Sequence, residues 1–208
     1  MFQGPKGELN RIAELHYFYR SILSEGLKTR TITQEGKGIV GNFNTYYDYW
    51  IAAHGDRFFD MGTIIRLGST IESILRNYYM SKVGHKSLLD LRSDQDYRRG
   101  IFQRIHPWSG NDTAIALFGR RLGVNLEGVA RFKGVQELML HRHLYAHNCG
   151  LLDDEYLGRL KQLTGIDLMG DQGISATYPA QDTYYFSPLN RLNDFIEQSR
   201  EFVHNLTS

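Results

Sequence analysis

The sequence predicts an all-α protein, and two observations lead to that prediction. Apolar residues recur every three or four positions in four long segments, at 8–25, 59–83, 126–147 and 187–206. This spacing places them on one face of a helix. Clusters of Gly, Pro, Ser, Thr and Asn separate the segments, which is typical of turns between helices. We therefore expect an up-and-down four-helix-type bundle, with extra short helices and room for one small β-hairpin.

The first half of the chain contains two of the long helices. In the segment 8–25 the apolar face consists of Leu9, Ile12, Leu15, His16, Tyr19, Ile22 and Leu23. The segment 59–83 has the longer stripe, formed by Met61, Ile64, Ile65, Gly68, Ile71, Ile74, Leu75, Tyr78 and Tyr79. Between them, 27–41 lacks periodicity and predicts a loop, whereas the aromatic segment 43–51 predicts a short packed helix, with a strand as the alternative.

The second half begins with a broken region and then becomes regular. Short helices are expected at 88–92, 95–105 and 111–122, and a long one from Leu126 to His147. Asn148 and Gly150 tolerate the left-handed conformation that ends a helix, so we place the end just after His147. The remaining expected elements are a helix at 153–164, a weak hairpin at 173–186, and a last helix with Ser187 as its N-cap and Pro188 in its first turn.

Length and composition limit the classes to which the protein can belong. A chain of 208 residues suits a single domain, which we expect to span 6–208 because Phe2 to Pro5 resemble the tail of a cleavable expression tag. No apolar run reaches the ~20 residues of a membrane span, and no signal peptide is apparent. The single cysteine, Cys149, cannot form an internal disulfide. We therefore expect a soluble, cytoplasmic protein without membrane contact.

Charge is distributed unevenly along the chain. The net charge is +1, which by itself gives no reason to expect nucleic acid as a partner. Between Arg92 and Asn148, however, nine Arg and Lys face five Asp and Glu, a local charge of +4. This is a modest form of the basic footprint expected for phosphate binding, although a solvated helix face would account for it equally well.

The segment 135–156 concentrates the titratable side chains. On an ideal helix His143 and His147 lie on the apolar side, and His141 lies on the polar side. His143 is then either a satisfied interior histidine or part of a site. Arg142 points about 140° away from His147, so their side chains meet only across a groove or where the helix opens.

Three kinds of chemistry could use these residues. His143 and His147, four residues apart, could bind zinc, but a site needs three or four ligands and HExxH is absent. Cys149 could act as a thiol nucleophile, but a neighbouring histidine in sequence does not establish the spatial pairing that this requires. An arginine that binds phosphate and a histidine that transfers protons suit metal-free cleavage of a phosphodiester.

A family resemblance favours the third alternative. The hexapeptide from Arg142 to His147, RHLYAH, resembles the RxxxxH motif of the HEPN superfamily of small helical bundles, which includes many prokaryotic toxin and defence ribonucleases. Asn148, the turn at Cys149–Gly150 and the acidic start of the next helix also resemble several HEPN branches, and the similarity spans most of 59–206. The broken region 87–123 and the helix 8–25 exceed a minimal HEPN domain, which leaves the branch open.

The resemblance implies a homodimer whose two motifs line one cleft and cleave RNA without metal or another cofactor. The ribose 2′-hydroxyl would attack the adjacent phosphate, with His147 as acid–base residue and Arg142 as phosphate clamp. His143, Asn148 and Glu72 would support them. Glu72, on the rim of its helix, either orients Arg142 or His147 or forms an ordinary ion pair. An antitoxin or other regulatory protein would be a further partner. Because some relatives are inactive, the alternative is a non-catalytic dimerisation or scaffold module.

Overall fold

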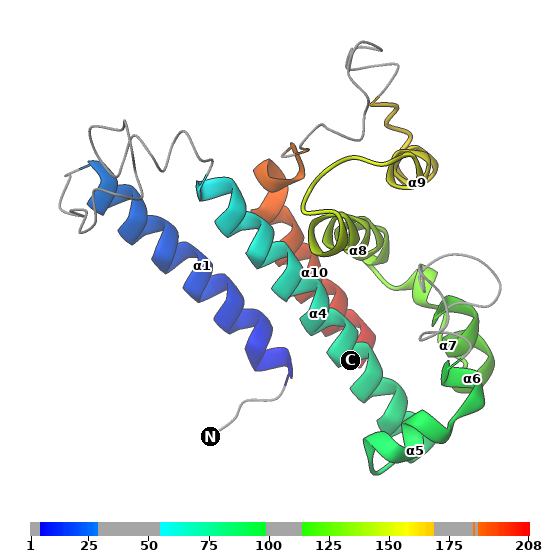
Figure 1. The fold of residues 1–208 in the computed structure, drawn as a ribbon. Coiled ribbons are helices and arrows are strands. Elements are labelled where there is room, and N and C mark those ends of the chain that lie inside the picture. Colours follow the sequence, from blue (N-terminus) through cyan, green and yellow to red (C-terminus); the bar gives the residue numbers. More distant parts are fainter. Residues whose placement is uncertain (1–4, 29–54, 99–113, 169–184, 186) are drawn as a thin grey trace.

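The computed structural model describes residues 5–28, 55–98, 114–168, 185 and 187–208 (Figure 1). Its helices are α1 (Pro5–Lys28), α4 (Gly55–Val83), α5 (Leu88–Ser93), α6 (Gln95–Tyr97), α7 (Ala114–Leu122), η2 (Leu126–Gly128), α8 (Phe132–His147), α9 (Asp154–Thr164), η4 (Ser187–Arg191) and α10 (Leu192–Thr207). None of the described residues belongs to a β-strand. The expectation of an all-α helical bundle is confirmed.

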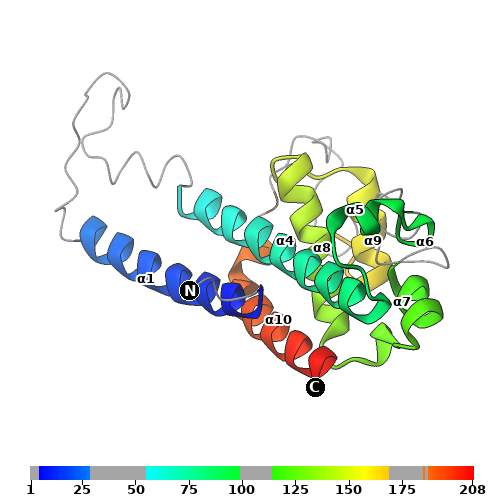
Figure 2. The same cartoon turned by 90° about the horizontal axis from the view of Figure 1, so that it is seen from below.

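Helix α4 is the centre of the bundle. Helices α1 and α10 lie alongside it, and α7 packs near its C-terminal end (Figure 1). Helices α8 and α9 are seen almost along their axes in the same view, so α8 crosses α4 steeply, and Figure 2 shows this crossing from below. Ile64, Leu67 and Ile71 are fully buried. Because several helices cover α4, its apolar residues occupy more than one side.

Polar contacts fix α1 against the first half of α4. Arg20 donates to the buried carboxylate of Asp60 at 2.9 Å. Near the other end of the contact, the guanidinium of Arg66 binds Glu8, with its Nε 3.1 Å from the carboxylate. The ends of such long side chains lie outside the apolar seam, so these pairs orient α1, whereas buried residues such as Ile12 supply most of the packing energy.

Most of the predicted helices are confirmed within one or a few residues. The segments 8–25 and 59–83 form α1 and α4, both with earlier starts, and α1 already includes Pro5, Leu27 and Lys28. The segments 88–92 and 153–164 form α5 and α9, and 111–122 contains α7. Two carboxylates cap helix starts: Asp153 accepts from the amide of Tyr156, and Asp90 completes a capping box with Ser87.

Two boundaries differ from the prediction. The prediction of a continuous helix from Leu126 was wrong. The chain forms the single turn η2 and then passes through Arg131 in a left-handed conformation (φ 68°) before α8 begins. The last helix also does not start at Ser187 as a regular α-helix. Ser187 and Pro188 lie in the 3-10 turn η4, and α10 begins at Leu192.

Several expectations fall on residues outside the described part of the chain. They are the remainder of the loop 27–41, the short helix 43–51, the hairpin 173–186, and parts of 95–105 and 111–122. Among the helices that the structure does describe, none combines the length and the apolar character needed to cross a bilayer.

Candidate active site

The C-terminal end of α8 carries the predicted motif, and the helix ends where the sequence indicates. The amides of Asn148 and Gly150 both donate to the carbonyl of Leu144, at 2.9 and 3.3 Å. Cys149 and Gly150 adopt positive φ angles of 53° and 89°, which reverse the chain. Asn148 itself is not left-handed, so the prediction is correct for Gly150 and shifted by one residue for Asn148.

Asn148 connects this helix end to the next helix. Its side-chain amide donates to the carboxylate of Asp153, the residue that caps α9. This hydrogen bond links the residue that ends α8 to the residue that caps α9, across the turn between the two helices. Asn148 accordingly joins the end of α8 to the start of α9.

Arg142 lies across α4 and is anchored there. Its Nη1 donates to Glu72 at 2.9 Å, and its Nε donates to Ser69 at 3.3 Å. The side chain is 23% exposed, and that of Glu72 is 38% exposed. Partial burial raises the pKa of Glu72, although the nearby cations Arg142 and Arg76 act to lower it. Glu72 therefore contacts Arg142, and this contact is compatible with both roles considered for it, the ordinary ion pair and the orientation of Arg142.

Gly68 gives Arg142 the room to take this path. A Cβ atom built at Gly68 would lie 2.6 Å from Cδ of Arg142, well inside van der Waals contact. The position therefore needs glycine if Arg142 is to reach Ser69 and Glu72. Sequence reasoning placed Gly68 in an apolar stripe and did not identify Ser69. The only available signal was a glycine inside a long helix, which often marks a close approach.

His143 and His147 form a pair at the surface. Their ring centroids are 4.7 Å apart, with an angle of 45° between the planes. His143 is half-buried and His147 is exposed. The expectation that both would face the apolar side was therefore wrong for His147. The cause is the orientation of α8, which buries the side that carries Leu138, His141 and Leu144 against its neighbours.

His141 was also misplaced by the helical wheel. It was expected on the polar face, but it is 1% exposed and packs against Phe195 of α10 and Tyr156 of α9. Its Nδ1 lies 2.8 Å from the hydroxyl of Tyr156, and its Nε2 lies 3.4 Å from Glu137. Burial lowers the pKa of His141, so the ring is neutral, even though Glu137 acts to raise the pKa.

These contacts determine which ring nitrogen of His141 carries the hydrogen. Burial raises the pKa of Glu137, but hydrogen bonds from His141 and Arg191 outweigh it and leave the pKa below its usual value. A carboxylate can only accept, so Nε2 of His141 carries the hydrogen. Nδ1 then accepts from Tyr156. His141 is therefore a satisfied structural histidine, whereas His147 presents its ring to solvent.

The predicted site residues Glu72, Arg142, His143 and His147 thus form two groups around the C-terminal end of α8. Glu72 and Arg142 meet at the crossing with α4, and His143 and His147 meet on the outer surface. The described residues show no hydrogen bond between Arg142 and His147, in accordance with their angular separation on α8. Three or more His, Cys, Asp or Glu side chains do not converge on a potential metal site anywhere in the described ranges.

Comparisons with protein-family models, with curated proteins and with solved structures found no match for this chain.

Proposed function

We propose that the protein is a metal-independent endoribonuclease of HEPN type, acting in the cytoplasm as a toxin or defence effector. The observation that supports the proposal is the arrangement at the end of α8. Arg142 is oriented by Glu72 and Ser69, and His147 is exposed about 1.4 turns later on the same helix. The proposal combines this arrangement with the RxxxxH resemblance.

The chemistry follows from the donor and acceptor groups. A guanidinium has five N–H donors, and Glu72 and Ser69 occupy only part of those of Arg142. The remaining donors can bind the phosphate oxygens that gain charge in the transition state. The 2′-oxygen attacks phosphorus and loses its proton, the bond to the 5′-oxygen breaks, and that oxygen receives a proton. His147 supplies one of these proton transfers, leaving a cyclic phosphate and a 5′-hydroxyl.

A homodimer completes the proposed site. Within one chain, Arg142 lies toward α4 and His147 lies on the outer surface, so the two side chains do not face one phosphate. A second copy whose α8 end lies opposite the first would place His147 of one chain near Arg142 of the other. RNA is the substrate in this proposal, and an antitoxin or other regulatory protein that covers the helix end is a natural partner.

Labelled RNA and DNA of the same sequence test the proposal, each incubated with wild-type protein and with His147→Ala, with and without EDTA. We expect wild type to cleave RNA equally in both buffers and to leave DNA intact, because DNA lacks the attacking hydroxyl. Size-exclusion chromatography should show about twice the chain mass of 24.0 kDa. Cleavage of DNA, or activity that EDTA abolishes and zinc restores, would replace the proposal with a metal-dependent mechanism.

A non-catalytic dimerisation or scaffold module is the second candidate, and one observation favours it. Arg142 is already neutralised by Glu72 and is only 23% exposed, as expected of a residue that joins α8 to α4. In that case the protein is dimeric and no RNA is cleaved. The same incubation distinguishes the two candidates, provided that circular dichroism shows the purified protein to be helical.

A further inference from the structure

The side chain of Arg142 follows α4 toward the C-terminal end of that helix. Its stem passes Gly68, its Nε donates to Ser69 at 3.3 Å, and its Nη1 donates to Glu72 at 2.9 Å. Because these partners succeed one another along α4, the guanidinium is carried toward the last turns of the helix. Arg76 is the next charged residue on this face, four positions after Glu72 and ~6 Å further along the axis.

Glu72 and Arg76 have the spacing of an ion pair that they do not form. A glutamate four residues before an arginine is the favourable arrangement for such a pair on a helix. Glu72 is bound by Arg142 instead, and Nη2 of Arg76 donates to Ser73 at 2.8 Å. Nε of Arg76 is buried and has no hydrogen-bond partner among the residues that the structure describes. Arg76 therefore keeps a donor that lacks the acceptor a buried N–H group normally has.

The charges of both arginines nevertheless reach Glu72. Burial raises the pKa of Glu72, and Arg142 and Arg76 both act to lower it. Arg76 and Glu72 also act together on Tyr97: burial raises the pKa of its hydroxyl to about 12, while the cation acts to lower it and the carboxylate to raise it further. The guanidinium of Arg76 thus lies close enough to the carboxylate of Glu72 to interact with it, although the two form no hydrogen bond.

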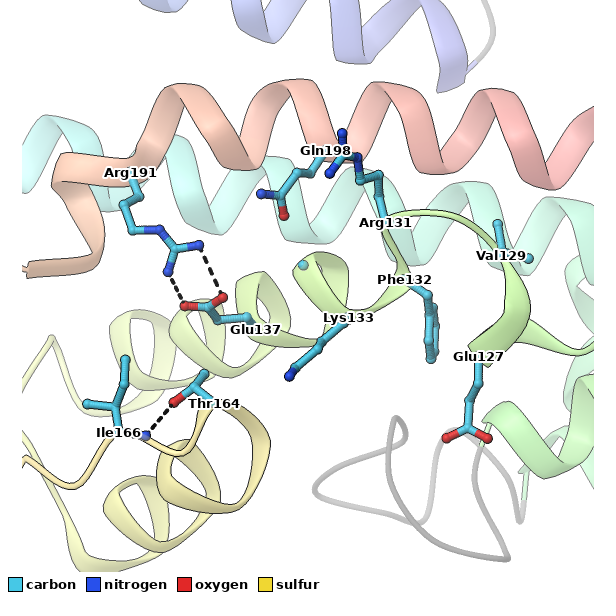
Figure 3. A pocket seen from close by; sticks show the side chains of 11 residues that line it. Glu127, Val129, Arg131, Phe132, Lys133, Glu137, Thr164, Ile166, Arg191 and Gln198 are labelled. Carbon is cyan, nitrogen blue, oxygen red and sulfur yellow. Dashed lines mark hydrogen bonds and ion pairs between the residues drawn. The ribbon is translucent and has the colours of Figure 1, made fainter.

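Glu137 on α8 shows a different arrangement, in which one arginine occupies the whole carboxylate (Figure 3). Arg191 donates to both of its oxygens, at 2.5 and 3.3 Å, through two separate nitrogens. Arg142, by contrast, donates to Glu72 through one nitrogen and reaches only Oε1. Within the described part of the chain, no donor binds Oε2 of Glu72. One oxygen of this carboxylate is therefore open to a second arginine.

We propose that Arg76 is an alternative partner of Glu72, which binds this carboxylate when the phosphate of RNA draws the guanidinium of Arg142 away. The inference rests on the proposed function, in which Arg142 binds the charge that develops on phosphate. Without a second cation, that movement would leave a partly buried carboxylate unpaired beside a negatively charged substrate, which is strongly unfavourable. Arg76 is a positioning residue in this proposal, because it acts through Glu72 and Arg142 and does not contact RNA.

A double-mutant cycle in urea denaturation tests the shared carboxylate without a measurement of activity. Methionine keeps most of the apolar stem and has no N–H donor, so the variants are Arg76→Met, Arg142→Met and the double variant. Each single variant leaves one arginine for Glu72. The double variant leaves none, and its urea midpoint should fall by about 0.5 M more than the sum of the two single shifts. This coupling should vanish in a Glu72→Gln background. Arg200→Met is the matched control: Arg200 pairs with Glu197 on α10, so its shift should simply add to that of Arg142→Met.

Single-turnover cleavage of RNA tests the role in the reaction. At saturating RNA the rate should fall about tenfold in Arg76→Met and largely recover in Arg76→Lys, which restores the charge. The RNA concentration that gives half the maximal rate should not change, because Arg76 acts only when Arg142 stabilises the transition state.

The two measurements separate this inference from the proposed function. Additive shifts in the urea cycle, or coupling that persists in the Glu72→Gln background, overturn the inference whatever the cleavage rates are. Coupling in the cycle with full cleavage by Arg76→Met overturns the role of Arg76 in the reaction. Coupling in the cycle with no cleavage by the wild-type protein overturns the proposed function and supports the sharing of Glu72 by the two arginines.

Discussion

His141 and His147 lie six residues apart on the same helix, yet their surroundings are opposite. His141 is enclosed by α9 and α10 and has a partner at each ring nitrogen, whereas His147 is exposed and contacts the ring of His143. A histidine that exchanges protons with a substrate needs access to it and an uncommitted nitrogen. The comparison therefore separates a histidine suited to stabilising the bundle from one suited to chemistry.

The same division extends to the two arginines bound to carboxylates on α8 and α4. Arg191 binds both oxygens of Glu137, whose charge is also contacted by a buried histidine. Arg142 contacts Glu72 through one nitrogen and keeps donors for another acceptor. Arg142 at the end of α8 is thus held in place by Glu72, but some of its N–H donors are not used. Four predictions test whether this difference separates function from stability.

The largest effect is expected for Arg142→Lys. Lysine keeps the charge but cannot contact Glu72, Ser69 and a phosphate through one planar group, so RNA cleavage should fall by about 10²-fold or more. Single-turnover cleavage is the measurement, with Arg159→Lys as the matched control because Arg159 forms an ordinary pair with Glu155 on α9. Unchanged cleavage by a folded Arg142→Lys variant would mean that Arg142 only joins α8 to α4.

The next effect is expected for His141→Ala, in stability. Removing the ring leaves a buried cavity and takes one partner each from Glu137 and Tyr156, which should lower the free energy of unfolding by about 2–4 kcal/mol. His147→Ala removes only an exposed ring and should change it by less than about 0.5 kcal/mol. Urea denaturation measures both variants. Similar losses in the two would show that burial does not distinguish these histidines.

The helices could be predicted from the sequence because their signals are local. The apolar spacing of α4 and the acidic start of α9 depend only on neighbouring residues, and both were recovered. A basic partner for Glu72 could be anticipated, because a carboxylate on the rim of an apolar stripe usually faces a cation, and Arg142 was one of the two partners considered. No local signal indicated that Ser69 would be a further partner.

The orientation of α8 could not be predicted in the same way. His141 and His147 both follow apolar residues at helical spacing, and which of them is buried depends on where α9 and α10 pack. The assumed start at Leu126 added to the error, since the helix begins only after Arg131 turns left-handed. Arginine has no particular preference for that conformation, so the break carried no signal in the sequence.

A third prediction concerns pH. The pKa of His141 is below the ordinary 6.5 because of burial, so above pH 6.5 the ring is neutral in both the folded and the unfolded protein. Below that pH the unfolded chain binds a proton that the folded protein does not, and stability falls as the pH falls. His141→Gln should therefore flatten the decline in unfolding free energy between about pH 7.5 and 5.

His16 contributes to the same decline, because burial and, secondarily, Arg20 lower its pKa as well. The slope should consequently decrease in His141→Gln without disappearing. His147→Ala, which removes an exposed ring from the same helix, serves as the control. A slope that changes in His147→Ala and not in His141→Gln would reverse the assignment of the two histidines.

The smallest effect is expected from two glycines of α4. Alanine favours a helix over glycine by ~1 kcal/mol, so Gly62→Ala, whose added methyl meets no atom within 4 Å, should stabilise the protein by about that amount. Gly68→Ala gains the same helical preference, but its added Cβ would lie 2.6 Å from Cδ of Arg142 and would force that side chain away, which offsets the gain.

Gly68→Ala should also reduce RNA cleavage, by less than Arg142→Lys does, because the guanidinium remains but leaves its position beside Ser69. Urea denaturation and single-turnover cleavage of the two variants together separate the effect of the position of Arg142 from the effect of its charge. If Gly68→Ala is as stable and as active as Gly62→Ala, the contact of Arg142 with Glu72 and Ser69 does not set its role.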